Sequence, residues 1–250
     1  MVKLRVGARC EYPKFLEDVR EIELAFFKVA DFLKLDINEI IREVSEERNR
    51  DVITIHAPNA KVHRFREFMD VIKRCCVLAN AFDCESIVLH PCFIKRKIRR
   101  DRVFYLLKSV VEPMLDEHGV YLCWETFMSK DRLFRNPHEI FEFCRNSDRF
   151  RMCYDFSHIP LSSEETLAQV REYRDVILVY HVSNREWGHA GKSGGLNHIP
   201  IFDKRGVLDF KKILNFEVLN RNASLILEYR EEFHCFLKVD IDVVKKILRL

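Results

Sequence analysis

Eight short apolar runs alternate with longer segments of helical periodicity along the chain. The runs are rich in Val, Ile, Leu and Tyr, a composition typical of parallel strands that are covered by helices. We predict strands at residues 4–10, 21–27, 52–58, 86–91, 120–127, 151–158, 176–184 and 224–230.

The segments between the runs carry apolar residues at helical spacing. In residues 61–82, one stripe contains Val62, Phe65, Phe68, Met69, Ile72 and Cys76. Further helices are predicted at residues 13–19, 38–47, 101–118, 138–145, 163–173, 208–220 and 239–249, with Asp36 as a cap of the second.

This alternation predicts an α/β protein with a single (β/α)8 TIM barrel domain spanning residues 1–250. A doubly wound sheet is the alternative, but it would need a glycine-rich phosphate turn after an early strand. The chain has only seven glycines and no such turn. Eight strands also complete a barrel.

The composition is that of a globular protein with a large core. Hydrophobic residues make up 48% of the chain and charged residues 32%, and no apolar run approaches a membrane span of about 20 residues. The N-terminus shows no signal-peptide pattern, so we expect a cytoplasmic protein without a membrane partner. Of the nine cysteines, Cys123 and Cys153 should point into the barrel as small apolar residues rather than form disulfides or bind metal.

Six of the predicted strands end in a side chain that can bind metal. These residues are His56, His90, Glu125, Asp155, His181 and Glu228. Their spacings of 34, 35, 30, 26 and 47 residues agree with about 30 residues for one strand and its returning helix in a barrel of roughly 250 residues. Since barrel enzymes carry their active sites at the carboxyl ends of the strands, the six side chains are expected to converge.

The strongest subset consists of Glu125, Asp155, His181 and Glu228, because each ends an inward-facing run where an unpaired charge would be costly. Imidazole and carboxylate together suit Zn²⁺, Mn²⁺ or a similar divalent ion. A hydrogen-bonded barrel rim is the alternative. His158 could bind a second metal, orient a substrate or cap a loop, and His198 gives a weaker signal alone.

The ordered set of HAP, LHP, Glu125, DFSH, His181, HIP with GVLDF, and LILE resembles the xylose isomerase-like barrel superfamily, also called the apurinic endonuclease family 2 barrels. The resemblance covers roughly residues 52–230 and implies a divalent-metal enzyme. In the sugar isomerases and epimerases of this superfamily, one metal is held by residues that match Glu125, Asp155, His181 and Glu228.

In the apurinic endonucleases, three zinc ions also use residues that match His56, His90, His158 and His198. That family has an additional Asp two residues before the last histidine, where this chain has Leu196. The resemblance therefore implies between one and three metal ions per chain.

Basic residues follow three of the predicted strands. Residues 95–102 read KRKIRRDR, and further basic residues are Lys130, Arg132, Arg135, Arg185 and Lys192. A basic mouth favours a small anionic or sugar substrate, with nucleic acid as an alternative, although a charge run is equally typical of a solvated helix start. Trp187 could stack on a sugar or base. We take Arg185, Trp187 and His198 as candidate substrate-binding residues.

Two reaction classes fit these residues. In an isomerase or epimerase, a metal would act as Lewis acid while Glu125 or Glu228 moves the proton, with His158 as a further candidate catalytic residue. In a zinc-dependent endonuclease, clustered metals would hydrolyse a phosphodiester. His56 and His90 favour the endonuclease, whereas Leu196 and the lack of glycine-rich DNA-binding loops oppose it. We favour the isomerase or epimerase. A non-enzymatic metal-binding barrel and a homo-oligomer both stay open.

Overall fold

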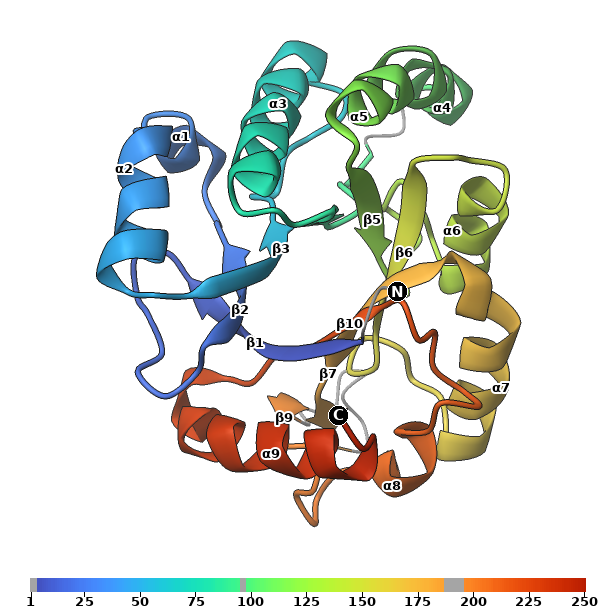
Figure 1. Ribbon diagram of the computed structural model, residues 1–250. Helices are drawn as coiled ribbons and strands as arrows, with labels where there is room; N and C mark the ends of the chain where they lie inside the picture. The colour runs from blue at the N-terminus through green and yellow to red at the C-terminus, as the bar shows by residue number, and fades with distance from the viewer. Residues whose placement is uncertain (1–3, 95–97, 187–195) are drawn as a thin grey trace.

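The computed structural model describes residues 4–94, 98–186 and 196–250. Its centre is a closed barrel of parallel strands in the order β1-β10-β7-β6-β5-β4-β3-β2 (Figure 1). The strands are β1 Arg5–Glu11, β2 Glu21–Ala25, β3 Asp51–His56, β4 Ser86–Leu89, β5 Tyr121–Glu125, β6 Phe150–Asp155, β7 Ile177–Val182 and β10 Ser224–Leu227. All eight overlap the predicted runs, so the predicted (β/α)8 TIM barrel is confirmed.

Helices surround the barrel (Figure 1). They are α1 Val29–Phe32, α2 Ile37–Arg42, α3 Phe65–Ala81, α4 Arg100–Leu106, α5 Glu112–His118, α6 Pro137–Cys144, α7 Ser163–Tyr173, α8 Phe210–Ile213 and α9 Leu237–Ile247. Helix α2 runs into a π-helical turn at Glu43–Glu47, and a second such turn at Leu107–Val111 joins α4 to α5. Short 3-10 helices lie at Arg174–Val176 and Glu231–Phe236. The predicted cap is confirmed, since the Asp36 side chain accepts a hydrogen bond from Asn38 N.

Two predicted helices are wrong. Residues 13–19 form turns and irregular chain between β1 and β2. A seven-residue helix would rise only about 10 Å, too little to return the chain along a seven-residue strand that spans about 23 Å. Of residues 208–220, only Phe210–Ile213 is helical. The side chains of Asn215 and Asn220 accept hydrogen bonds from backbone N–H groups two residues later, and such local bonds compete with helix continuation.

The barrel interior is layered, and the layers position the site. One layer of side chains packs together inside the barrel and includes Val88, Cys123, Cys153, Val179 and Ile226. Each of these five residues lies two positions before a predicted metal ligand. Because side chains alternate across a strand, the residue two positions later also faces inward, one layer nearer the carboxyl ends. The cysteine prediction is confirmed in part, since Cys123 and Cys153 are buried and all nine cysteines are free.

A small antiparallel ribbon follows the carboxyl end of β7. It pairs β8 Asn184–Arg185 with β9 Asn197–Ile199, which carries His198. Within the described residues, no helix is long and apolar enough to cross a membrane.

Candidate metal centre and active site

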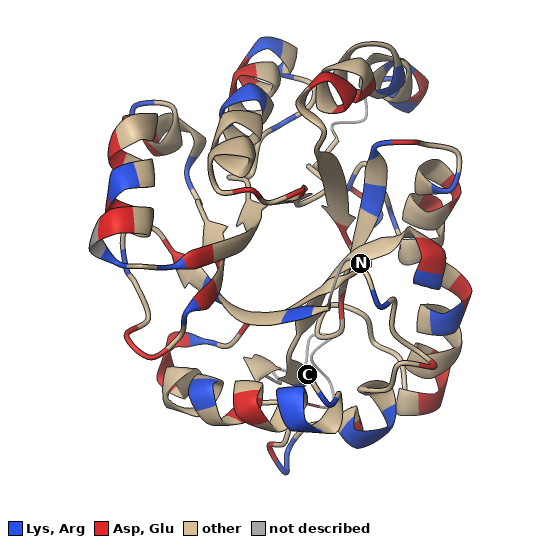
Figure 2. Ribbon diagram, in the orientation of Figure 1, with Lys and Arg blue, Asp and Glu red and all other residues tan. Residues whose placement is uncertain are grey.

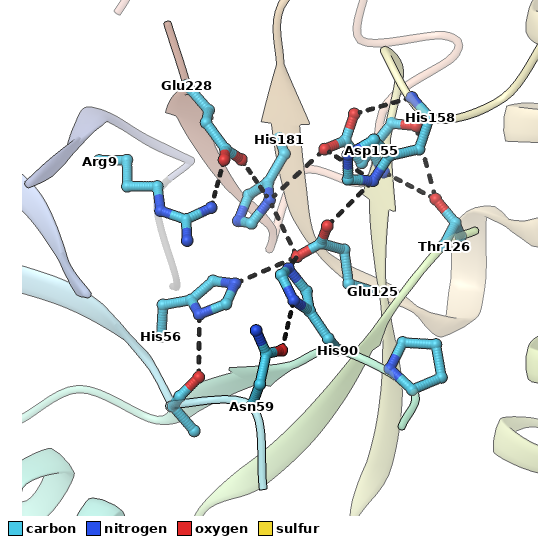
Figure 3. Close-up of polar contacts among 12 residues, drawn as sticks. Arg9, His56, Asn59, His90, Glu125, Thr126, Asp155, His158, His181 and Glu228 are labelled. Carbon is cyan, nitrogen blue, oxygen red and sulfur yellow. Dashed lines mark hydrogen bonds and ion pairs between the residues drawn. The ribbon is translucent and has the colours of Figure 1, made fainter. Parts of the chain in front are cut away.

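Glu125 lies at the centre of the converging side chains, at the carboxyl end of β5 (Figure 3). Its Oε2 atom is 3.1 Å from His56 Nε2 and 2.9 Å from His90 Nε2. Its Oε1 atom is 3.0 Å from His158 Nδ1. The Glu125 side chain is fully buried, so its carboxylate depends on these neighbours for electrostatic stabilisation.

Asp155, His181 and Glu228 form the other half of the cluster. His181 Nδ1 lies 3.0 Å from Glu228 Oε2, 3.5 Å from Glu125 Oε2 and 3.9 Å from Asp155 Oδ2. The second oxygen of Asp155, Oδ1, accepts hydrogen bonds from the backbone N–H and the hydroxyl of Ser157. Asp155 is thus held by one oxygen, while the other faces His181 and His158.

Several of these close contacts are not hydrogen bonds. The buried atoms Glu125 Oε1, Asp155 Oδ2, His158 Nδ1, His181 Nδ1 and Glu228 Oε2 have no aligned hydrogen-bond partner. Buried polar atoms normally find such a partner. Neutral histidine nitrogens and carboxylate oxygens that converge in this way are the arrangement that a cation satisfies, and protons on the histidines take its place in the metal-free protein. The donor set therefore fits a divalent metal ion.

His56 and His90 approach the Oε2 atom of Glu125 from the other side, and the His56 contact is within hydrogen-bond geometry. His56 donates from Nδ1 to the carbonyl of Ala57 at 3.1 Å, and His90 Nδ1 lies 2.6 Å from Asn59 Oδ1 (Figure 3). A neutral imidazole that donates from Nδ1 has a bare lone pair on Nε2. Burial, followed by the nearby Arg9 charge, lowers the pKa of His56 and favours its neutral form. In that tautomer Nε2 and the Glu125 carboxylate are both acceptors, so a metal ion or a proton on Nε2 would join them.

Four groups of side chains could hold a metal ion within the described residues. They are His56–His90–Glu125, Glu125–Cys153–His181, Asp155–His158–His198 and Asp155–His181–Glu228. The structure thus brings together all six predicted ligands, along with His158 and His198. Cys153, which the sequence predicts to be a small packing residue only, also lies close enough to Glu125 and His181 to share a metal ion with them.

His198 approaches the cluster from β9. Its backbone adopts a left-handed conformation with φ of 51°, and its Nδ1 lies 3.1 Å from the hydroxyl of Ser183. Its ring centroid is 5.1 Å from that of His158. His198 therefore lies beside Asp155 and His158, with ligand atoms of the three residues within 4.8 Å of one another.

Two buried charged residues of the site were missed by the sequence analysis. Glu23 on β2 is fully buried, and its Oε2 lies 3.0 Å from His181 Nε2. Arg9 on β1 forms an ion pair with Glu228 Oε1, and its Nε lies 3.9 Å from Glu23 Oε1. A signal was present, because both charges interrupt apolar strands at inward-facing positions. They do not stand at the ends of the apolar runs, where metal ligands are expected.

Negative charge dominates the metal-free centre. Glu23, Glu125, Asp155 and Glu228 bring four carboxylates together. Against them stand the positive charge of Arg9 and two histidines, His158 and His181, whose pKa values are raised. Burial would raise the pKa of Glu125, but the neighbouring imidazoles of His90, His158 and His56 outweigh it and lower that pKa well below its usual value. Burial likewise opposes protonation of His158, yet Asp155 and Glu125 raise its pKa to about 9.

Other predicted residues lie elsewhere. Arg185 donates to the carbonyls of Ile159 and Leu161 and is almost fully buried, so its guanidinium supports the loop after β6. Arg132 donates to the Pro91 carbonyl and stacks over Phe127. Trp187, Lys192 and residues 95–97 lie outside the described residues.

The described basic residues do not gather as a separate surface. Figure 2 shows Lys and Arg spread over the outer helices and loops among acidic residues. Arg99 pairs with Asp101, and Arg100 and Arg135 pair with Glu139. Part of the expected basic mouth is therefore neutralised by partners on the same face.

Comparison with known proteins identifies the family. Residues 18–232 match the sequence profile described as xylose isomerase-like TIM barrel. The chain belongs to the xylose isomerase-like TIM barrel family. Comparison with curated proteins gave no match.

Solved structures of this family share the whole fold. A D-tagatose 3-epimerase-like protein is 15% identical, with a TM-score of 0.71 and 98% of each chain covered. D-Psicose 3-epimerase, solved in the presence of D-fructose, is 11% identical, with a TM-score of 0.70 over 98% of this chain and 99% of the other. The IolI protein with a bound zinc atom is 15% identical, with a TM-score of 0.65 and 96% of each chain covered.

By the sequence resemblance, Leu196 matches the additional Asp of the endonucleases. Leu196 is half-buried, and its backbone N–H donates to Glu186 Oε2. A leucine side chain offers no ligand atom. The group Asp155–His158–His198 is therefore poorer in carboxylates than the group around Glu228.

Proposed function

We propose that this protein is a divalent-metal-dependent isomerase or epimerase that acts on a sugar or sugar phosphate at the carboxyl ends of the barrel strands. The observation that carries the proposal is the convergence of Glu125, Asp155, His181 and Glu228 with lone pairs that lack hydrogen-bond partners. The fold shared with sugar epimerases supports the same reaction class.

These four residues would hold the metal. When bound, a divalent ion supplies Lewis-acid polarisation of neighbouring carbonyl and hydroxyl oxygens. Two carboxylates of the set, Glu125 and Glu228, are candidates for carrying the proton between substrate carbons. Their surroundings differ, and this difference favours Glu228 as the residue that meets the substrate.

Glu228 borders an open space, whereas Glu125 is enclosed by histidines. The Glu228 side chain is 15% exposed and that of Glu125 is fully buried. Glu228 lines a cavity of about 350 Å³ together with Arg9, Phe27 and His234. A sugar ring fits a cavity of this size, and the exposed Phe27 ring provides an apolar face for it. His158, 12% exposed, is a candidate proton carrier from the opposite side of Glu125.

Among the proposed substrate-binding residues, His198 has the best position, since it borders both Ser183 and His158. The bonds of Arg185 to backbone carbonyls support a role in holding the loop after β6. Trp187 stays a prediction from the sequence.

A zinc-dependent phosphodiesterase is the second candidate function. His56 and His90 direct Nε2 toward Glu125, and this group could hold a second metal. Two metals sharing a carboxylate are typical of enzymes that cleave phosphate esters. Leu196 and the pairing of Arg99 and Arg100 with carboxylates weigh against a DNA substrate.

Metal content and two activity assays test the proposal. Purified protein is loaded with Zn²⁺ or Mn²⁺, bound metal is measured by elemental analysis, and the protein is offered a panel of ketoses and their phosphates. A duplex with an abasic site is offered in parallel. We expect isomer interconversion that a chelator abolishes and no strand cleavage. Cleavage without isomerisation would overturn the proposal in favour of the phosphodiesterase.

Two variants separate the metal groups. Glu125→Gln removes a carboxylate that belongs both to the proposed four-residue site and to the His56–His90–Glu125 group. This variant is expected to abolish tight metal binding and activity. His90→Gln leaves Asp155, His181 and Glu228 intact, so it should remove at most one metal and retain the other. A folded Glu125→Gln protein with full metal content and full activity would show that the site is wrongly assigned.

A further inference from the structure

Glu23 is a fully buried carboxylate directed at a proposed metal ligand from the side opposite the metal. It lies on β2, a strand that supplies none of the proposed ligands. Its Oε2 atom is 3.0 Å from His181 Nε2, and both side chains have no exposed surface. His181 Nδ1, on the other edge of the ring, faces Glu228, Glu125 and Asp155.

The geometry constrains which nitrogen of His181 can bind a cation. A carboxylate only accepts hydrogen bonds, so His181 must donate from Nε2 to Glu23. In a neutral imidazole, the lone pair then lies on Nδ1. Nδ1 is the atom that faces the three carboxylates and has no aligned hydrogen-bond partner. Glu23 therefore fixes both the orientation of the His181 ring and the nitrogen that carries its proton.

Arg9 places Glu23 within a continuous network. Its guanidinium forms an ion pair with Glu228 Oε1, and its Nε lies 3.9 Å from Glu23 Oε1. The strands that carry these groups, β7, β10, β1 and β2, are consecutive neighbours in the barrel. Glu23, Arg9, Glu228 and His181 thus contact one another around a closed circuit on one half of the site.

We propose that Glu23 is a positioning residue that fixes His181 for metal binding through Nδ1. This inference rests on the proposed metal-dependent function. Partners of this kind orient ligating histidines, and their loss typically weakens metal binding by about 10- to 100-fold. A purely structural ion pair between Glu23 and His181 is the competing explanation. It predicts a change in stability but no change in metal affinity or ligand field.

The test measures metal binding without any activity assay. Zn²⁺ affinity is determined by competition with a chromophoric chelator, and the visible spectrum of the Co²⁺-loaded protein reports the ligand field. Glu23→Met keeps the side-chain length but cannot accept the hydrogen bond, whereas Glu23→Gln can. Glu21→Gln is the matched control, because Glu21 lies on the same strand but pairs with Arg5 and Lys245 away from the site.

We expect Glu23→Met to bind Zn²⁺ about 10- to 100-fold more weakly and to alter the Co²⁺ spectrum. Glu23→Gln should recover part of the affinity, and Glu21→Gln should match the unaltered protein. A folded Glu23→Met protein with unaltered affinity and spectrum would overturn the inference while leaving the proposed function in place. If Glu23→Met does not fold, Glu23→Asp decides, because its shorter carboxylate should also weaken binding, and unchanged affinity would overturn the inference. An unaltered protein that binds neither ion refutes the proposed function and this inference with it.

Discussion

Arg9 compensates part of the negative charge of the metal-free site. Its side chain is only 10% exposed and lies between Glu228 and Glu23. Burial alone would lower the pKa of Arg9, but the surrounding carboxylates raise it, so the guanidinium stays charged. Arg9 and a bound cation therefore stabilise the same carboxylates.

Replacing this residue should make the stability of the protein depend on metal. Arg9→Met is expected to lower the free energy of unfolding of the metal-free protein by about 3–5 kcal/mol, because buried carboxylates lose their partner. Zn²⁺ should restore much of this loss. Urea unfolding with a chelator and with Zn²⁺ measures both values. If Arg9→Met lowers the free energy of unfolding equally with chelator and with Zn²⁺, Arg9 and the metal do not stabilise the same carboxylates.

The predictable residues of the site are those that end apolar runs. His56 and Asp155 are the last residues of β3 and β6, and His181 is the last but one of β7, so these candidate ligands could be predicted from the ends of the apolar runs. Glu23 and Arg9 lie inside their strands, and the pairing of β2 with β3 shifts register between Ile22 and Glu23. The height of a side chain within the barrel depends on how its strand is aligned with the neighbouring strands. A register shift such as this one leaves no local pattern in the sequence, so the position of Glu23 relative to His181 could not be predicted.

At the scale of elements, Asn184 organises the loop that brings His198 to the site. Its buried side chain donates to the carbonyls of Ile201 and Leu208 and accepts from the backbone N–H groups of Arg185 and Leu208. Gly206 passes directly over this amide, and a Cβ on Gly206 would lie 2.2 Å from Asn184 Nδ2. The loop therefore needs both residues.

Gly206→Ala is expected to displace Asn184 and to destabilise the protein by about 1–3 kcal/mol through overpacking. Asn184→Ala should cost about 1–3 kcal/mol for each backbone group left buried without a partner. Thermal unfolding measures both effects. Lys204→Ala is a suitable control, since Lys204 is exposed in the same loop. If Gly206→Ala unfolds at the same temperature as the control, the close packing does not stabilise the loop.

Strands and long helices were predictable because their periodicity is local. Helix α3 matches residues 61–82 closely, since its apolar stripe packs against the barrel over its whole length. Loops such as residues 200–208 depend on side chains that bond to the backbone up to 24 positions away, as Asn184 does with Leu208. Loop geometry of this kind has no repeating pattern in the sequence, so the sequence places Arg185 after a strand but does not reveal its bonds to the carbonyls of Ile159 and Leu161.

At the scale of the whole molecule, the site makes the stability of the metal-free barrel depend on pH. The pKa of His158 is raised to about 9 by Asp155 and Glu125 against the effect of burial. A raised histidine pKa contributes stability that is complete below the unfolded value of about 6.5 and is lost as the pH rises through about 9. The pKa of His181 is raised as well and acts in the same direction. His56 acts oppositely, but only as the pH falls through about 6.5.

Metal-free protein should therefore lose stability between pH 6.5 and pH 9, with a contribution from His158 on the order of 3 kcal/mol. Urea unfolding in chelator across this range measures the loss. His158→Gln should flatten the profile, whereas replacing the helix residue His138, which is not part of the cluster, should leave it unchanged. A profile for His158→Gln as steep as that of the unaltered protein would contradict this assignment.

The burial of the cysteine thiols can be used to measure whether the packed core of the barrel is intact. Eight of the nine cysteines are buried, and only Cys235 is exposed. Burial raises the pKa of Cys84 and of Cys123 to about 12, which suppresses the reactive thiolate. A disulfide-exchange reagent should therefore label one thiol quickly in the folded protein and all nine after denaturation. Cys235→Ser should remove the fast phase without changing thermal stability. Rapid labelling of several thiols under native conditions would show that the core opens far more readily than its packing implies.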